Sequence, residues 1–180
     1  MVTVRPTLPQ DEHIGQVFVA HGLTQYSRYQ RFQTGLRELP ASAARYLTDI
    51  DYQKHFALVA EIFADRDHLQ VAEARFVRDA QVPGHAEFAL AVADAWQGLG
   101  LGSRMLDTLM AAAAAHGITQ LYGDVLRDNR AMLGLASGSG FTVRAHPQDS
   151  RLLRVLRRAE APAEVKPGRP ARAVSVAAGR

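Results

Sequence analysis

Three glycines at alternate positions, placed directly before an amphipathic helix, constrain this chain more than any other feature. The segment runs from Gln97 through Gly98, Gly100 and Gly102 to Ser103. Glycine lacks a Cβ atom, so the backbone of this turn can approach a ligand closely. The free N–H groups at the start of the helix point into one concavity, where the helix dipole favours negative charge. The segment therefore predicts that backbone donors of residues 99–103 bind a pyrophosphate group.

The glycine turn has three other interpretations. Glycine spacing alone is equally compatible with a turn that only begins a helix. A Walker loop is excluded, because it needs Gly-Lys-Ser/Thr and Arg104 follows Ser103 here. A Rossmann dinucleotide site stays open as a minor alternative, since Asp124 lies at a suitable separation for a ribose contact. Against it, Ser103 stands in the place of the third glycine, and a polar turn separates the strand from the glycines.

The hydrophobic periodicity on either side of the turn predicts a mixed sheet. Three strands separated by short turns form an antiparallel meander before the turn, and a strand, a helix and two further strands follow the helix. This order predicts an α/β (α+β) fold, with a mixed, mostly antiparallel central sheet and helices on both faces. The expected strands are 2–5, 56–63, 69–77, 85–93, 119–125, 141–144 and 152–156, and the expected helices are 9–20, 23–39, 40–48, 102–116 and 129–137.

Length and charge indicate one folded domain followed by a tail. The chain has 180 residues, which is typical of one domain, and we expect that domain to span 1–158. Residues 159–180 are rich in Ala, Pro, Gly and Arg without an apolar period, which predicts a disordered basic tail. Six basic and two acidic residues lie in 157–180, which leaves 15 basic and 16 acidic residues in the rest. A folded part so close to neutral argues against nucleic-acid binding.

Several other classes of protein are excluded or disfavoured. The chain has no cysteine, so disulfides and thiolate metal sites are excluded. The scattered His, Asp and Glu residues show no metal-ligand spacing, and we expect no metal. The first residues lack the apolar stretch of a signal peptide, and no apolar run approaches the roughly 20 residues needed to span a bilayer. We therefore expect a cytoplasmic protein without a membrane partner.

Two motifs resemble those of a known family. Gln97-x-x-Gly100-x-Gly102 resembles the Gln/Arg-x-x-Gly-x-Gly/Ala signature of the GNAT acetyltransferase superfamily. Asn129, followed by Gly140-Phe141 eleven and twelve residues later, resembles that family's second acetyl-CoA motif. The resemblance covers about residues 2–156. It implies a GNAT fold that binds acetyl-CoA as cosubstrate and transfers the acetyl group to a primary amine.

A narrower likeness concerns the acceptor. The segments 26–32 and 47–60 are similar to the acetyltransferase domain of bacterial protein lysine acetyltransferases. This likeness implies a protein lysine as one acceptor, beside small amines, and a homodimer is among the assemblies expected of such folds. Helix 23–39 mixes aromatic and basic residues, which suits one buried face and a basic rim. The charges of this rim either face solvent, which is the commoner case, or meet an acidic partner surface. The aromatic residues are Tyr26, Tyr29 and Phe32, and the basic ones are Arg28, Arg31 and Arg37.

The resemblance and the strand pattern together predict a site. Glu87 alternates with the apolar set of its strand and so faces the other side of the sheet, where we expect it to act as general base. The backbone of the same strand is expected to pair with the pantetheine arm of the cofactor, as an added strand would. Asn129 has the alternative role of a helix N-cap. The predicted cofactor-binding residues are Leu90, Ala91, Val92, Gln97, Gly98, Leu99, Gly100, Leu101, Gly102, Ser103, Asn129 and Met132.

The proton donor to the thiolate is missing from its usual place. In many GNAT members a tyrosine stands seven residues after the motif's Asn, and here that position is Ala136. This absence supports an alternative function, a catalytically weak acyl-CoA-binding sensor or regulatory domain. Tyr122 on the neighbouring strand is another candidate donor, although its spacing in the sequence does not show where its hydroxyl group lies. His55, His85 and Asp94 are weaker candidates for catalysis. The commoner alternatives are a buried, hydrogen-bonded residue for His55, a surface residue for His85 and a cap of its own turn for Asp94.

Overall fold

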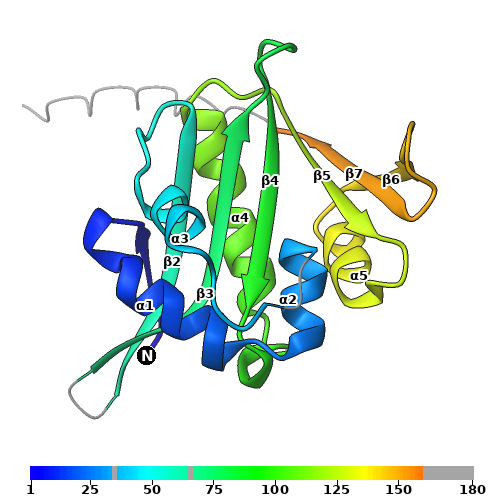
Figure 1. The fold of residues 1–180 in the computed structure, drawn as a ribbon. Helices are drawn as coiled ribbons and strands as arrows, with labels where there is room; N and C mark the ends of the chain where they lie inside the picture. Colours follow the sequence, from blue (N-terminus) through cyan, green and yellow to red (C-terminus); the bar gives the residue numbers. More distant parts are fainter. Residues whose placement is uncertain (34–35, 65–66, 160–180) are drawn as a thin grey trace, which may run out of the picture.

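The computed structural model describes residues 1–33, 36–64 and 67–159 (Figure 1). The tail predicted at 159–180 lies, except for Ala159, outside these residues. The described residues form one seven-stranded sheet in the order β1-β2-β3-β4-β5-β7-β6, in which every neighbouring pair is antiparallel except β4 and β5. The predicted mixed, mostly antiparallel sheet is therefore confirmed. The strands are β1 (Thr3–Pro6), β2 (His55–Ala64), β3 (Asp67–Arg78), β4 (His85–Val92), β5 (Gln120–Leu126), β6 (Thr142–Ala145) and β7 (Leu152–Arg158).

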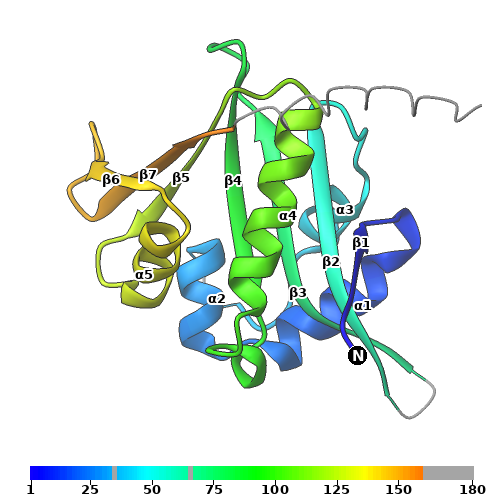
Figure 2. The same ribbon diagram turned by 180° about the vertical axis from the view of Figure 1, so that it is seen from behind.

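Helices cover both faces of the sheet, as predicted. Helices α1, α2 and α3 lie in front of it in Figure 1, and α4 crosses the opposite face in Figure 2. The expected helix 9–20 consists of a 3₁₀ turn at Pro9–Asp11, helix α1 and a π turn at Phe18–Gly22. None of the helices in the described residues is long and apolar enough to cross a membrane. The helices are α1 (Glu12–Val17), α2 (Gln25–Phe32), α3 (Ala41–Thr48), α4 (Leu101–Ala115) and α5 (Arg130–Gly138).

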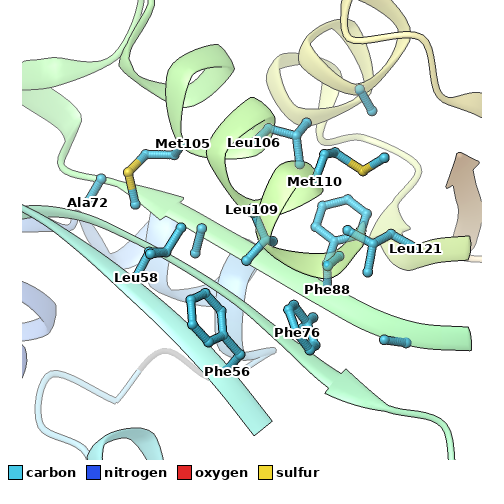
Figure 3. Close-up of a cluster of buried hydrophobic side chains, with 14 of the residues drawn as sticks. Phe56, Leu58, Ala72, Phe76, Phe88, Met105, Leu106, Leu109, Met110 and Leu121 are labelled. Atoms are coloured by element: carbon cyan, nitrogen blue, oxygen red, sulfur yellow. The ribbon is translucent and has the colours of Figure 1, made fainter. Parts of the chain in front are cut away.

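The main core lies between α4 and the sheet (Figure 3). The apolar stripe of α4 at Leu106, Leu109 and Ala113 is fully buried, as its period of three and four residues predicts. It packs against the alternate residues of the strands, among them Phe76 and Leu121, which are also fully buried. Burying each large side chain contributes about 1.5–3 kcal/mol. This core fixes α4, and hence the glycine turn at its start, onto β3 and β4.

Strands β4 and β5 separate soon after they meet. Their parallel pairing is limited to His85–Glu87 opposite Gln120–Tyr122. The Phe88 ring lies against Gly123 immediately beyond that pairing, where a Cβ atom on Gly123 would stand 2.9 Å from the ring. Beyond this point β4 stays paired with β3 and β5 with β7. The edge of β4 that faces β5 is therefore left without a strand partner.

Helix α2 differs from its prediction. It ends at Phe32, because Gln33 adopts a left-handed conformation with φ of 54° that closes the helix. Tyr26 and Tyr29 are 59% and 45% exposed, so the buried face of the helix does not include these two residues.

The expected basic rim on α2 is also wrong in part. Arg28 is buried, and its Nη1 donates to the carbonyl oxygens of Val19 and Leu23, which belong to or follow the π turn. Arg31 pairs with the carboxylate of Glu73 on the sheet. Only Arg37 of the three arginines is exposed. The aliphatic part of an arginine side chain can pack like an apolar group when backbone carbonyls accept hydrogen bonds from its guanidinium group. Helical spacing alone does not show which arginines are buried in this way.

Two glycine-to-alanine substitutions should have opposite effects on stability. Gly123→Ala places a methyl group against the Phe88 ring, and overpacking of this kind costs about 1–3 kcal/mol. Gly134→Ala in α5 meets nothing within 4 Å and should stabilise by about 0.5–1 kcal/mol, because alanine restricts the unfolded chain. Urea unfolding measures both. Equal stability of the two variants would contradict the tight contact between Phe88 and Gly123.

Candidate active site

The glycine turn has the backbone conformation that its sequence predicts. Gly98 and Gly100 have φ of 72° and 80°, in the left-handed region that residues with a Cβ rarely adopt. Helix α4 begins directly after Gly100, and no side chain caps its first turn. The N–H groups at the start of a helix have no partner within it, so those of Leu101 to Ser103 are available to an anion.

A groove of about 730 Å³ runs from this turn along the space where β4 and β5 separate. Its walls come from β4, β5, the start of α4, α5 and α2. Two predicted residues do not line it, because the Leu99 side chain is 71% exposed and Leu101 is buried in the core. For both residues the expected contact with the pyrophosphate is made by the backbone N–H group, and it stays a prediction. The predicted residues that line the groove are Glu87, Leu90, Ala91, Val92, Gln97, Gly98, Gly100, Gly102, Ser103, Asn129 and Met132.

Two of the predicted polar side chains hold the groove together. Gln97 donates from Nε2 to the carbonyl oxygen of Val92 at 3.1 Å, which joins the turn to the end of β4. Asn129 accepts from the N–H of Met132 at 3.0 Å and so caps α5. The N-cap role considered for Asn129 is confirmed.

Helix α2 forms a wall of the groove that the sequence did not predict. Asp94 fastens its start by accepting from the N–H and Oγ1 of Thr24 at 3.0 and 3.1 Å and from Oγ of Ser27 at 2.8 Å. Gln30 donates to Asp128 at 3.3 Å, which connects α2 to the loop before α5. Asp94 therefore has a structural role, as expected, although it caps α2 and not its own turn. The sequence signal for this wall is the similarity of segment 26–32 to the domain of bacterial protein lysine acetyltransferases. That similarity alone does not place the segment in the site.

Glu87 lies on the face of the sheet that its alternation predicts, opposite the main core. It is paired in register with Val77 of β3 and Tyr122 of β5. Partial burial of its carboxyl group raises its pKa, and the charge of Asp124 raises it further. Arg154 and Arg31 act in the opposite direction without cancelling the rise. A raised pKa makes the carboxylate a stronger base than an ordinary glutamate, which suits a group that accepts a proton.

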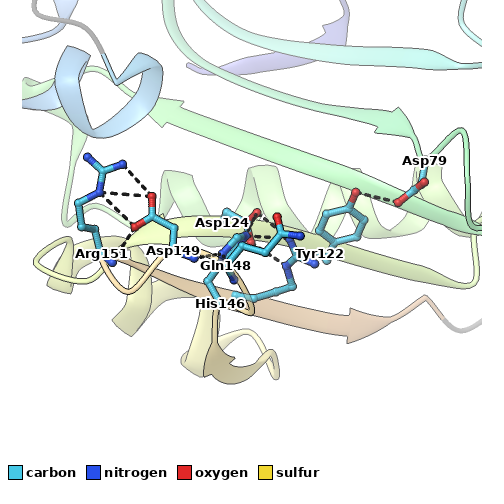
Figure 4. Close-up of polar contacts among 8 residues, drawn as sticks. Asp79, Tyr122, Asp124, His146, Gln148, Asp149 and Arg151 are labelled. Atoms are coloured by element: carbon cyan, nitrogen blue, oxygen red, sulfur yellow. Dashed lines mark hydrogen bonds and ion pairs between the residues drawn. The ribbon is translucent and has the colours of Figure 1, made fainter.

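The charge that raises the pKa of Glu87 is held by a fixed network (Figure 4). Arg154 donates from Nε and Nη2 to the two oxygens of Asp124, each at 2.8 Å. His146 accepts at Nδ1 from the N–H groups of Gln148 and Asp149, so the hydrogen of its neutral form is on Nε2, which lies 3.2 Å from Asp124. The carboxylate of Asp124 is thus oriented from two sides.

Tyr122 does not point its hydroxyl group toward Glu87. It donates to Asp79 at 3.0 Å (Figure 4), and burial together with this bond raises the pKa of Tyr122 to about 12. The phenol therefore keeps its proton at neutral pH. Its assignment as donor to the thiolate stays open.

A second cavity of about 410 Å³ lies on the same face of the sheet, beyond Glu87. Residues of β3, β4, α3 and the end of α2 line it. Both cavities are lined by Arg31 and Glu87, together with Gln33, Phe88 and Ala89. We name this second cavity the acceptor pocket. The carboxyl group that suits a general base is thus at the junction of two cavities, which is where a group transferred between two ligands would react.

His55 has a structural role. His55 is buried, stacks on Tyr46 and lies with Nε2 3.0 Å from Nη1 of Arg75. Burial, and then the charge of Arg75, lower the pKa of His55 to about 4, so it is neutral at pH 7. In the described part of the chain, no group of His, Asp and Glu residues is placed to hold a metal ion.

The Rossmann alternative is wrong. A dinucleotide fold needs a largely parallel sheet, whereas β4 and β5 form the one parallel pair among the described strands. Asp124, the proposed ribose contact, is engaged by Arg154 and His146.

Comparison with known proteins identifies the family. The family model described as "Acetyltransferase (GNAT) family" matches residues 26–141. The acetyltransferase PA5475 of Pseudomonas aeruginosa is 32% identical over 149 residues, which cover 83% of this chain and 79% of that protein. The acetyltransferase Pat of Mycolicibacterium smegmatis is 34% identical over 132 residues, or 72% of this chain but 38% of that protein. This chain therefore spans well under half the length of Pat.

Solved structures agree with the family model. The GNAT domain of S. lividans PAT superimposes with a TM-score of 0.80 at 26% identity, covering 87% of this chain and 90% of that one. The fold of yncA from Salmonella typhimurium, a structure with acetyl-CoA, has a TM-score of 0.66 at 19% identity, covering 91% and 96%. Family model, relatives and fold agree with the geometry of the groove, and the chain belongs to the GNAT family of acetyltransferases.

Proposed function

We propose that this chain transfers the acetyl group of acetyl-CoA directly to a primary amine, with Glu87 as the general base. The observation that supports this most is the position of Glu87 at the junction of the groove and the acceptor pocket. A ligand in each cavity would meet at this carboxyl group. Direct transfer needs both ligands bound together, because the amine nitrogen must reach the thioester carbonyl.

The groove suits acetyl-CoA along its whole length. The N–H groups from Leu99 to Ser103 would hold the pyrophosphate at the start of α4, where backbone donors and the helix dipole favour an anion. The unpaired edge of β4 at residues 90–92 would hydrogen-bond the amides of the pantetheine arm, as a strand does when added to a sheet edge. The thioester would then lie close to Glu87.

Glu87 would make the amine nucleophilic. An amine enters mostly as an ammonium ion, and its lone pair becomes available when the carboxylate of Glu87 takes a proton, directly or through one water. The nitrogen then forms a bond to the carbonyl carbon, the carbon–sulfur bond breaks, and the thiolate of CoA takes up a proton. The raised pKa of Glu87 makes its carboxylate a stronger base toward that proton.

The acceptor class is a further part of the proposal. The similarity to PAT and Pat domains supports a protein lysine as acceptor, and the acceptor pocket opens next to the exposed Tyr46, where a side chain can enter. A homodimer is proposed on the same family grounds.

A second function, an acyl-CoA-binding sensor, is favoured by one observation. Ala136, the position of the usual proton donor, is fully buried in the core. The two functions differ in turnover and not in binding. Thermal unfolding with acetyl-CoA, CoA and NAD, followed by thiol release with a panel of amines and lysine peptides, separates them. Stabilisation by NAD alone contradicts both, and stabilisation by acetyl-CoA without thiol release supports the sensor.

The first prediction concerns the pyrophosphate turn. Gly100→Ala places a side chain at φ of 80°, which costs about 1 kcal/mol and moves the N–H groups that the anion needs. Gly117→Ala is the matched control, because it has φ of 72° after the other end of α4, far from the groove. Calorimetric titration should show weaker acetyl-CoA binding only for Gly100→Ala. Equal affinities of the two variants would place the pyrophosphate elsewhere.

The second prediction concerns the base. Glu87→Gln keeps the size of the side chain and removes its basicity, so kcat should fall by about 10²–10⁴-fold. The affinity for acetyl-CoA should stay the same, because that ligand is held by the turn and by β4. Glu38→Gln, an exposed glutamate outside both cavities, should keep full activity. Full turnover of Glu87→Gln at neutral pH shows that another group is the base.

The third prediction concerns pH. Glu87 must be unprotonated to act, so kcat/KM falls as the pH drops below its pKa. The charge of Asp124 raises that pKa, hence Asp124→Asn should lower it and move the acidic limb of the pH profile to lower pH. The same substitution removes the carboxylate partner of Arg154, whose positive charge then lowers the pKa of Glu87 further. Asp107→Asn on the exposed side of α4 is the control, and an identical acidic limb in both variants would contradict the assignment.

A further inference from the structure

The acceptor pocket has an unusual charge for a pocket that receives an amine. Among the described residues that line it, Arg31 and Arg75 are the cationic groups, and Glu87 is the one carboxylate. The rest of its lining is mostly apolar, with Leu39, Leu47 and other residues of α3 and β3. An ammonium ion alone would therefore meet two guanidinium groups on its way to Glu87.

One buried carboxylate serves both arginines. Glu73 lies beneath the pocket and is 4% exposed. Its Oε1 accepts a hydrogen bond from Nε of Arg31 at 3.1 Å and forms an ion pair with Nη2 of Arg31 at 2.8 Å. Its Oε2 accepts from Nη2 of Arg75 at 2.5 Å. His55, which also contacts Arg75, is neutral. The cluster of Arg31, Glu73, Arg75 and His55 thus carries one uncompensated positive charge.

The cluster also has donors without acceptors. The Nε atom of Arg75 is buried and makes no hydrogen bond within the described residues. Arg31 uses Nε and Nη2 for Glu73, while its Nη1 has no partner among the residues described, and its guanidinium stacks 4.7 Å above the Phe32 ring. A charge removed from water needs a partner of opposite sign. Arg31 lines the pocket, so a ligand there can supply one.

Glu87 cannot compensate the excess positive charge of the cluster throughout the reaction. Its carboxylate attracts Arg31, yet it must become neutral when it takes the proton of the amine. The excess positive charge beside it is then greatest at the moment of transfer. A second negative charge, carried by the acceptor itself, would stay in place before and after that proton moves.

We propose, on the basis of the acetyl transfer proposed above, that the acceptor pocket selects amines that also carry a carboxylate, and that Arg31 binds this carboxylate while Glu87 receives the amine. Glu73 already engages Nε and Nη2 of Arg31, so Nη1 would donate to this carboxylate. Such a charge-assisted hydrogen bond is stronger than one between neutral groups. The carboxylate has two sources of the same chemistry, a free amino acid or the acidic side chain or C-terminus of a peptide.

Matched pairs of acceptors test the preference. The first pair is 6-aminohexanoate and hexylamine, which differ by one carboxylate at the end of an aliphatic chain. The second is Nα-acetyl-lysine with a free or an amidated carboxyl group, and the third is a lysine peptide with glutamate or glutamine beside the lysine. Steady-state thiol release should give a kcat/KM about tenfold or more higher for the charged member of at least one pair. The pair that responds identifies the source of the carboxylate.

Arg31→Gln tests the residue. The substitution leaves Glu73 paired with Arg75 alone, so the buried cluster loses its excess positive charge and becomes neutral. The KM of the preferred charged acceptor should rise about tenfold relative to that of the plain amine, so the preference between the two disappears. Arg45→Gln is the control, because this exposed arginine of α3 does not line the pocket and loses the same charge nearby. Urea unfolding establishes that both variants are folded.

Three results would overturn this inference. Equal kcat/KM within every pair means that the pocket does not select a carboxylate. A preference that persists in Arg31→Gln places its cause elsewhere, and an equal fall of kcat for all acceptors assigns Arg31 to the transfer step. Thermal stabilisation of the CoA-loaded protein by each acceptor measures binding without turnover. Selective stabilisation by the charged member with no thiol release contradicts the proposed transfer while supporting the inferred selectivity.

Discussion

The separation of β4 and β5 is the constraint on which the site depends. The two strands pair over three residues each and are then kept apart by the Phe88 ring, which lies against Gly123 and packs on Phe141 with ring centres 5.1 Å apart. A backbone edge without a strand partner must find other hydrogen bonds. The open edge of β4 is therefore both the consequence of this packing and the surface available to an extended ligand.

Glu87 lies at the last paired position of β4, so the same separation determines its surroundings. On the β5 side, the pair of Asp124 with Arg154 is neutral as a unit, and its carboxylate raises the pKa of Glu87. On the β3 side, Arg31 and Arg75 share the one carboxylate of Glu73. The two sides differ in net charge, and Glu87 lies between them. This asymmetry distinguishes the β3 side of Glu87 from its β5 side in electrostatic terms.

The sequence predicts the parts of the fold and site that depend on neighbouring residues. The period of α4, the left-handed glycines before it and the alternation that turns Glu87 away from the core are all local, and the structure has each of them. The contacts that the sequence does not predict join distant residues. Arg31 meets Glu73 across 42 positions and Asp94 meets Thr24 across 70. A buried arginine such as Arg28 has the same helical spacing as an exposed one, so the carbonyl groups that accept from it decide its place.

Helix α2 shows why these distant contacts matter for the chemistry. Asp94 fastens its start to the end of β4, Arg28 holds its middle to the π turn, and Arg31 binds its end to the sheet. The helix is short and has two exposed tyrosines, so its position comes from these polar contacts more than from apolar packing. Residues from both halves of the helix line the groove, and its last residues also line the acceptor pocket. The polar contacts that hold α2 therefore determine the shape of both cavities on either side of Glu87.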